Sequence, residues 1–483
     1  MENQKTKIIS IASIIALALT LVTATFAYFM AQTGEGKSTD IKINASTVDT
    51  FTFEAGSALN LSLNQENFAS GKGNQTGTTF AKAMLSANNK TNTATDHYYL
   101  YLNISNNTFT YSIDNNTPEI LLSIKDGGNN EITALTGLTY KTVTDGKGAS
   151  IKGFDITKKS GLITILNNRE ITTTSTKTEE WNVTVTFVNY NSNQAGNAGK
   201  NFSAKLMIQK EKIPTVLSDV CTSGNNLATC ITTLSNKSEP SIVNIYHHTS
   251  SLANGAGDNS YRYAGASDSV NNYICLGSDE ATCPDANLFR IIGVFGDKTK
   301  VIRAKSVGEQ EWDTNGSNTW SSSSLNTYLN GEYLTSLGTL ADKIATTTWK
   351  VGGGSRANIG NSVPATAYQY EVGSNASTTI IDKKIDLMYV SDYGFAASQE
   401  AWTTKLDSYD SNTSKNWLYL GSPEWTISRD SGTTSYAFYV HSVGVVFNGL
   451  VTYSLVVRPT FNLLSSAKYV SGSGTIENPI RIN

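Results

Sequence analysis

Hydrophobic and polar residues alternate along the chain between about residues 40 and 212. In the segment WNVTVTFVNY, at 181–190, apolar residues stand at every second position through Phe187, with asparagine or threonine between them. A period of two is typical of a β-strand with one buried and one wet face. Similar alternation occurs in HYYLYLNIS (97–105), FTYSI (109–113) and FSAKLMIQ (202–209). Turn signals such as KDGGNN and TDGKG separate these segments, so the pattern predicts an antiparallel β-sandwich.

The pattern changes around Pro214, where KEKIPTVLSD breaks the alternation and predicts a linker over residues 213–239. Beyond it, helical spacing appears in SSSSLNTYLNGEYLTSL (321–337), behind serines that can cap a helix. The segment VSDYGFAASQEAW (390–402) predicts a second short helix. Strand patterns bracket this region, from NLFRIIGVFG near its start to VVRPTFNL and NPIRIN at its end.

The fold class that these patterns predict is mainly β with some α. We expect an N-terminal antiparallel β-sandwich at residues 31–212 and an α+β domain at residues 240–483. A chain of 483 residues is long enough for two such domains, each with its own core. Charged residues make up only 16% of the chain, which agrees with exposed sheets rather than long helices.

An uncharged apolar run from Ile8 to Met30 follows a short basic end. This combination predicts that residues 1–30 are a signal peptide or a membrane anchor. The run is long enough to span a bilayer, which takes about 20 residues. Thr25 and Ala27 are also small enough for the positions that a signal peptidase reads. Both alternatives place the protein outside the cell.

The cysteines agree with export. They are Cys221, Cys230, Cys275 and Cys283, and none of them forms a C-x-x-C pair. An even number in an exported chain predicts disulfides, and local pairing (221 with 230, 275 with 283) is the simplest of three connectivities. Four thiolates can also hold zinc, although these spacings are wider than those of a zinc ribbon or knuckle.

The charge balance excludes one class of partner. The chain carries 37 basic and 40 acidic residues, so its net charge is -3. No excess of either sign draws it to nucleic acid or to anionic lipid. We therefore expect no nucleic-acid partner, and contact with a membrane only through residues 1–30 where these remain uncleaved.

The end of the leader, TATFAYFMAQTGEGKSTDIKINAS, is similar to the start of the camelysin and biofilm-fibre family of Gram-positive bacteria. The sequence departs from that family at residues 29–31, where the common Phe-Thr-Asp is replaced by Phe-Met-Ala. The resemblance implies a β-sandwich, cleavage near Ala27, and a freed arm that adds a strand to a neighbouring subunit. Self-association and a structural fibre subunit assembled by strand donation therefore remain open.

Five motifs, in one order, carry a second resemblance. They are NNYICLGSDEATCPDANLFRIIGVF, TWSSSSLNTYLNGEYL, IDLMYVSDYGFAAS, NWLYLGSPEWTISR and the closing VVRPTFNL with SGSGTIENPIRI. They resemble exported bacterial proteins with a C-type-lectin-like fold, which formylglycine-generating enzymes and the variable proteins of diversity-generating retroelements share. The resemblance covers roughly residues 240–483. It implies a bacterial cell-surface or secreted protein in which FRIIGV pairs with PIRIN and loops near the C-terminus form a ligand face.

No catalytic pattern accompanies this resemblance. Formylglycine-generating enzymes depend on cysteines late in the domain, whereas no cysteine follows Cys283. The motifs G-x-S-x-G and H-E-x-x-H and a complete phosphate loop are also missing, and the glycine-rich KVGGGSRANIG (350–360) predicts a surface turn. We therefore expect neither an enzyme nor a cofactor.

Two segments offer metal ligands that simpler explanations also account for. His247 and His248 are adjacent, so on a strand they point to opposite faces, and we expect an exposed turn rather than a metal site. In WDTNGSN, Asp313 and Asn315 could serve as calcium ligands, but a polar turn explains them equally well.

The tract YAFYVHSVGVVFNG, at 436–449, is rich in aromatic residues and free of Asp, Glu, Lys and Arg. Strand parity divides it into a core set and a contact set, with Tyr436, Phe438 and Val440 in the first and Tyr439, His441 and Phe447 in the second. Gly444 and the Asn-Gly pair at 448–449 permit turns. The alternative is that both faces are covered. The candidate ligand-binding residues are Trp425, Arg429, Tyr436, Tyr439, His441, Phe447 and Asn448.

The function that these observations predict is recognition and adhesion. We expect the domain at 240–483 to bind an extracellular protein or glycan through the candidate face, in one form as a diversified binder with variable residues at 424–458. The fibre subunit is the alternative. Arg458 is assigned a structural role, in which its guanidinium bridges carbonyls or a carboxylate.

Overall fold

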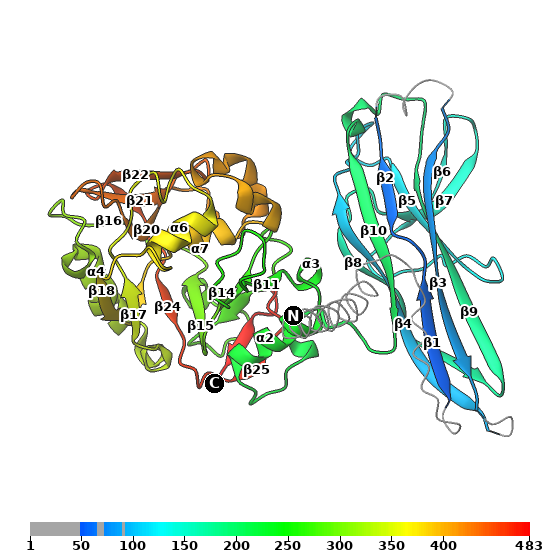
Figure 1. Cartoon of the computed structure of the whole chain (residues 1–483), viewed down its shortest axis with the longest axis horizontal. Coiled ribbons are helices and arrows are strands. Elements are labelled where there is room, and N and C mark those ends of the chain that lie inside the picture. The colour runs from blue at the N-terminus through cyan, green and yellow to red at the C-terminus, as the bar shows by residue number, and fades with distance from the viewer. Residues whose placement is uncertain (1–48, 65–71, 89–91) are drawn as a thin grey trace, which may run out of the picture. The chain divides into compact units, whose positions relative to one another are not determined.

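The computed structural model describes residues 49–64, 72–88 and 92–483. The chain is mainly β with some α and divides into two compact units, residues 1–212 and 213–483 (Figure 1). The predicted leader at 1–30 lies outside the described residues. Within the part of the chain that the structure describes, no helix is long and apolar enough to cross a membrane.

The first unit is a β-sandwich of two antiparallel sheets. The six-stranded sheet has the order β1 (Thr50–Ala55), β3 (Gln75–Ser86), β9 (Thr176–Phe187), β5 (Ile120–Asp126), β7 (Ser150–Asp155) and β6 (Tyr140–Thr144). The four-stranded sheet has the order β2 (Leu59–Ser62), β10 (Asn201–Gln209), β4 (Ala94–Asn107) and β8 (Gly161–Thr173). Alternate apolar residues of both sheets share one core, as the sequence pattern predicts for β4, β9 and β10.

The predicted strand at 109–113 is wrong. The backbone N–H of Thr110 donates to Asn197 Oδ1 (3.0 Å), and the backbone N–H groups of Ser112 and Ile113 donate to the Glu119 carboxylate. The backbone N–H groups of this segment therefore bond to side chains and not to a neighbouring strand. Alternation of residues in the sequence does not distinguish these two cases. Phe109 still fills the core as expected.

The second unit is built on a nine-stranded sheet. Its main path has the order β19 (Ile385–Asp386), β24 (Thr460–Asn462), β15 (Lys298–Arg303), β14 (Leu288–Phe295), β13 (Tyr273–Cys275), β26 (Ile480–Ile482) and β25 (Tyr469–Ser471). Two further strands, β11 (Ile245–His247) and β12 (Tyr261–Tyr263), join it beside β14. A five-stranded sheet has the order β16 (Glu309–Glu311), β23 (Ser454–Val456), β20 (Glu424–Arg429), β21 (Tyr436–Val440) and β22 (Val446–Leu450). The strands β17 (Thr347–Lys350) and β18 (Ile380–Lys383) form a separate pair.

Short helices pack around these sheets. They are α2 (Leu227–Lys237), α3 (Pro240–Val243), α4 (Ser324–Tyr328), α5 (Leu334–Ser336), α6 (Pro364–Glu371) and α7 (Val390–Phe395). The predicted helix behind the serine run is confirmed, because Ser323 caps α4 by accepting from the Asn326 N–H. The predicted helix at 390–402 is confirmed in its first half as α7 and continues as a 3₁₀ turn at Gln399–Thr403.

Residues 213–239, predicted as a linker, form part of the second unit. Leu227, Ile231 and Leu234 of α2 are buried in its core. They follow one another at four and three residues, a helical stripe that the surrounding threonines and asparagines obscure in the sequence. Both predicted disulfides are present, Cys221–Cys230 and Cys275–Cys283, and the first joins the start of α2 to the segment before it.

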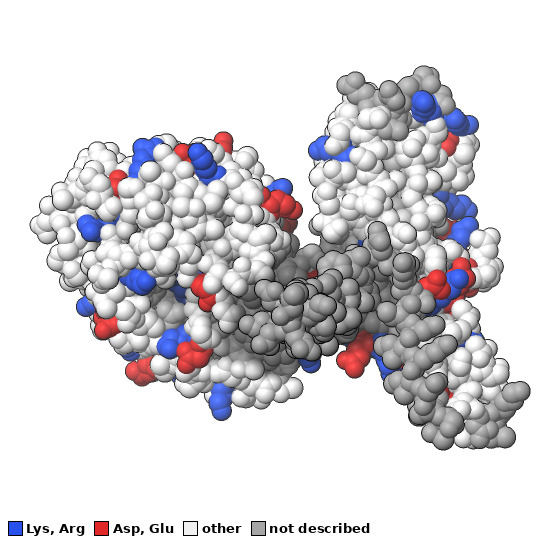
Figure 2. Space-filling view, viewed as in Figure 1, with Lys and Arg blue, Asp and Glu red and all other residues white. Residues whose placement is uncertain are grey.

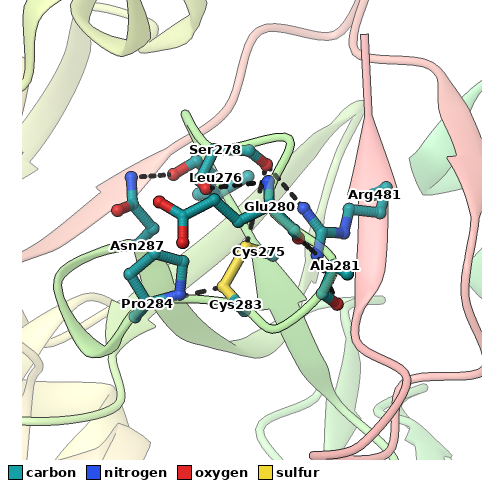
Figure 3. The surroundings of a disulfide bond; sticks show 9 residues. All are labelled: Cys275, Leu276, Ser278, Glu280, Ala281, Cys283, Pro284, Asn287 and Arg481. Atoms are coloured by element: carbon teal, nitrogen blue, oxygen red, sulfur yellow. Dashed lines mark hydrogen bonds between the residues drawn. A yellow bond between two sulfur atoms is a disulfide. The ribbon is translucent and has the colours of Figure 1, made fainter.

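The strand β26 pairs differently from the prediction. FRIIGV and PIRIN are not neighbours, because β13 lies between β14 and β26. β13 pairs with β14 through the nearby loop that the Cys275–Cys283 disulfide closes, and β26 then adds to β13 in parallel. Arg481 fixes this arrangement, since its guanidinium donates to the carbonyls of Ser278 and Glu280 in that loop (Figure 3).

Candidate functional site

The predicted contact residues lie on the β20–β21–β22 end of the five-stranded sheet. β21 and β22 run side by side as an antiparallel pair, and β22 is the edge strand (Figure 1). Tyr439 stands opposite Phe447 on one side and Trp425 on the other. Residues that stand opposite one another project from the same face of a sheet, so these three aromatic side chains form one row.

The opposite face of the hairpin is core. Phe438, Val440 and Val446 are almost fully buried, while Tyr436 is half-buried at the end of the strand. Two of the three predicted core residues, Phe438 and Val440, are therefore confirmed as buried, and the third, Tyr436, lies at the margin of the core. The turn lies at 441–445, where Gly444 has a φ of +88°. The Asn-Gly pair at 448–449, for which we predicted a turn, lies within β22 instead.

The row of aromatic side chains continues onto the surface. Tyr439 is half-buried, and its ring centroid lies 5.8 Å from that of Trp425 and 6.2 Å from that of His441. The His441 and Phe447 ring centroids are 5.9 Å apart. Phe447 is 37% exposed. Three of the predicted site residues, Tyr439, His441 and Phe447, thus share an accessible face.

Tyr453, which our sequence prediction omits, completes this face and is 46% exposed. A Cβ atom on Gly449 would lie about 3 Å from the rings of both Tyr453 and Tyr439, so the glycine allows the two tyrosines to approach the strand. Burial and the neighbouring Tyr453 raise the pKa of Tyr439, which therefore stays neutral. We call Tyr439, His441, Phe447 and Tyr453 the aromatic face.

Arg356 is a second residue that sequence reasoning missed. Its guanidinium lies 5.3 Å from the Phe447 ring centroid, a distance suited to a cation–π contact. It belongs to the glycine-rich segment at 350–360, in which Gly354 forms an isolated bridge to Asp430, just after β20. The segment was predicted as a surface turn, and only the folded structure shows that it borders the aromatic face.

The remaining predicted ligand residues have other roles. Trp425 is fully buried, and its indole N–H donates to the Gln310 carbonyl (3.0 Å), so it supports Tyr439 from below and is wrongly predicted as a contact residue. Arg429 donates through Nε to the Gly352 carbonyl (2.9 Å). Asn448 donates to Asp430 Oδ2 (2.6 Å) and opposes Phe438, on the other face.

A buried ion pair anchors the strand that carries Trp425. Arg458 donates through Nε and Nη2 to the two carboxylate oxygens of Glu424 (2.6 and 2.7 Å) and also to the Leu418 carbonyl. Burial raises the pKa of Glu424, and Arg458 opposes that shift. The structural role predicted for Arg458 is thus confirmed.

The two candidate metal-binding segments also have structural partners. Asp313 accepts from the backbone N–H groups of Ser317 and Ser324 (2.9 and 3.0 Å), which forms a polar turn. His248 is fully buried, so the predicted exposed turn is wrong for this residue. Its Nδ1 accepts from the Ala256 N–H, and burial, aided by a nearby arginine, lowers its pKa to about 2 and keeps it neutral.

Comparison with known proteins adds one match. Residues 296–465 are similar to a family described as a domain of unknown function, DUF6273. No protein among the curated ones matches the chain. The matched segment contains both the hairpin and Arg356, so the aromatic face lies within the region that this family shares.

Proposed function

We propose that the second unit is a recognition module of a protein displayed on, or secreted from, a bacterial cell, and that its aromatic face binds an extracellular protein. One observation carries the proposal. Among the described residues, four of the nine exposed large hydrophobic side chains fall between residues 443 and 453, namely Val443, Phe447, Leu450 and Tyr453, and two of these, Phe447 and Tyr453, belong to the aromatic face. Apolar exposure concentrated on so short a segment is typical of an interaction surface.

The chemistry of the face favours a protein over a nucleic acid or an anionic lipid. From residue 431 to residue 457 the sequence contains no Asp, Glu, Lys or Arg. On the side of the second unit shown in Figure 2, basic and acidic residues are scattered among broad uncharged areas. Tyrosine, other aromatic residues and a bordering arginine are the residues that supply most binding energy at protein interfaces.

The location outside the cell is part of the same proposal. Both disulfides join cysteines of the second unit and leave none of the four cysteines free, as in proteins of oxidising compartments. The leader and the arm for strand donation lie outside the described residues, so the fibre subunit remains a sequence-based alternative. A C-type-lectin-like fold for residues 240–483 is also part of this proposal.

Binding to arrays tests the proposal. The intact mature chain is applied to an array of purified extracellular protein domains and to a glycan array, beside a double variant, Phe447→Ala with Tyr453→Ala. The matched control is Leu464→Ala with Ile476→Ala, which truncates two exposed apolar residues elsewhere on the same unit. We expect protein binding that the first variant loses at least tenfold and the control retains. Binding that survives the first variant, or binding to glycans alone, would overturn the proposal.

A further inference from the structure

A cavity of about 460 Å³ lies in the second unit away from the aromatic face. Its walls come from β12, the β14–β15 turn, β17 and the two helices α6 and α7. Its volume is within the range of sites for small organic ligands. The residues that line it combine charged groups with aromatic rings, and both kinds lie mostly out of contact with water.

Two cations share one carboxylate at the base of this cavity. Asp392 accepts from Lys300 Nζ (2.5 Å) and from Arg262 Nη1 (3.3 Å). Arg262 has further partners, because Nη2 donates to Asp258 (2.6 Å) and Nε to Ser260 Oγ (2.8 Å). The side chains of Arg262, Lys300 and Asp392 are at most 5% exposed. All three nitrogens of the Arg262 guanidinium therefore have partners within the protein, and Arg262 holds Asp392 in place.

The Lys300 ammonium can form further hydrogen bonds. It has three N–H donors, and among the described residues its one hydrogen-bond acceptor is Asp392. Aromatic rings surround the same ammonium, with ring centroids of Tyr389, Trp349 and Phe295 at 4.9, 5.1 and 5.5 Å. An ammonium held in such a setting has lost most of its water, so a second acceptor would bind it strongly.

The cavity carries more positive than negative charge. The charged residues of its lining are Arg262, Lys300 and Lys350 against Asp258 and Asp392. Lys350 Nζ donates to the Val372 carbonyl (2.6 Å), and no described carboxylate forms an ion pair with it. The excess of one positive charge in this lining is carried by the half-buried Lys350, and a ligand with one negative charge would compensate it.

We propose that this cavity binds a small ring compound with a single carboxylate. The carboxylate accepts from the free N–H donors of Lys300 and is attracted by Lys350, while the ring lies against the apolar wall that includes Trp349 and Tyr368. Asp392 remains the partner of Arg262 and orients Lys300. This site shares no residue with the aromatic face, so the proposed ligand does not depend on the proposed protein partner.

Ligand titration of the full mature chain tests the proposal. The probes are benzoate and indole-3-acetate, each paired with its neutral amide, followed by calorimetry and by saturation-transfer NMR. We expect saturable binding of at least one acid, at least tenfold weaker for its amide, because the amide lacks the charge that Lys300 and Lys350 attract. No binding of either acid at about 10 mM, where even a millimolar site is mostly filled, would overturn the proposal.

Variants locate the site. Lys300→Met removes the proposed donor, and Lys350→Met, at a less buried position, removes the excess charge without disturbing Asp392. Lys305→Met, an exposed lysine paired with Asp285, is the matched control. Both cavity variants should weaken acid binding at least tenfold and the control should not. Acid binding unchanged in folded Lys350→Met, or equal binding of the acid and the amide, would contradict the assignment.

Discussion

Two buried carboxylates, one in each unit, are held in different ways. In the β-sandwich, Glu119 accepts from Ser112, Gln194 and Asn197, all of which are neutral donors. In the second unit, Asp392 accepts from the two cations Lys300 and Arg262. Neutral hydrogen-bond donors thus stabilise Glu119, whereas Asp392 is stabilised by ion pairs that depend on the presence of both partners.

The difference follows from the regularity of the backbone. In the sandwich, long paired strands satisfy one another's backbone groups, while the second unit contains long connections whose N–H and C=O groups need side-chain partners. Arg290 donates to the carbonyls of Ser267, Val270 and Trp417. Burial lowers the pKa of Arg290 to about 10, which still leaves it charged near neutral pH. Buried charges therefore hold the irregular segments of the second unit together.

Removing one partner of a buried ion pair gives the largest expected effect. Arg458→Met leaves Glu424 buried without its cation, which should destabilise the second unit by about 3–5 kcal/mol. Arg169→Met in the sandwich breaks a half-exposed pair with Glu179 and should have an effect of about 1 kcal/mol or less. Denaturant unfolding followed by tryptophan fluorescence measures both, since Trp181 reports on the first unit and the other six tryptophans report on the second. Similar losses from the two substitutions would break the comparison.

The next effect is a dependence of stability on pH. Glu371 accepts from the N–H groups of Val390 and Ser391 at the start of α7, and burial raises its pKa to about 7 from 4.5. The folded state thus binds this proton more tightly than the unfolded state. Stability contributed by Glu371 is complete below pH 4.5 and is lost as the pH rises towards 7, by roughly 3 kcal/mol at most.

Glu371→Gln tests this dependence. The variant should remove the fall in the unfolding free energy of the second unit between pH 4.5 and 7, as measured by denaturant titration at several pH values. Glu400→Gln, at an exposed position, should keep the wild-type profile. An unchanged slope in Glu371→Gln would show that another group titrates.

A smaller effect is expected for a neutral hydrogen bond of the sandwich. The Trp181 indole N–H donates to the Tyr98 hydroxyl (2.8 Å), which in turn donates to Glu179. Trp181→Phe should reduce the stability of the first unit by about 1–2 kcal/mol, because Tyr98 keeps its second partner. Hydrogen exchange of amides in β4 and β9 measures the change. A loss as large as that of Arg458→Met would contradict the contrast between the units.

The smallest effect is expected at the aromatic face. Phe447→Ala should change the stability of the second unit by about 0.5 kcal/mol or less, since the side chain is already 37% exposed. Phe438→Ala, on the buried side of the same hairpin, should reduce stability by about 3–5 kcal/mol. Thermal unfolding compares the two, and equal losses would mean that Phe447 is a core residue.

Local patterns predicted those parts of the fold that depend on local chemistry. Alternation located β9, the serine run located the cap of α4, and short loops favoured the two disulfides that form. Parity also separated Phe438 from Tyr439, because a strand alternates its side chains whatever surrounds it.

The rest depends on segments that are distant in the sequence. Trp425 was predicted to be accessible, but it is buried in the core of the second unit, where its indole N–H donates to the Gln310 carbonyl. Arg356 reaches Phe447 across about 90 residues, and the cavity joins Arg262, Lys300 and Asp392 from three separate elements. Contacts between such distant segments leave no periodicity or motif in the sequence. A charged residue within an apolar strand, such as Lys300 in KTKVIR, is the one sequence feature that could have indicated a buried charged site.

The pairing of β26 with β13 also governs how the second unit can be made. Ile480 pairs with Ile274, and Arg481 fixes the disulfide loop that begins at Cys275, so the two halves of this contact are synthesised about 200 residues apart. The main sheet cannot be completed until β26 has been translated. The complete sheet of this unit therefore forms only after the whole unit has been synthesised.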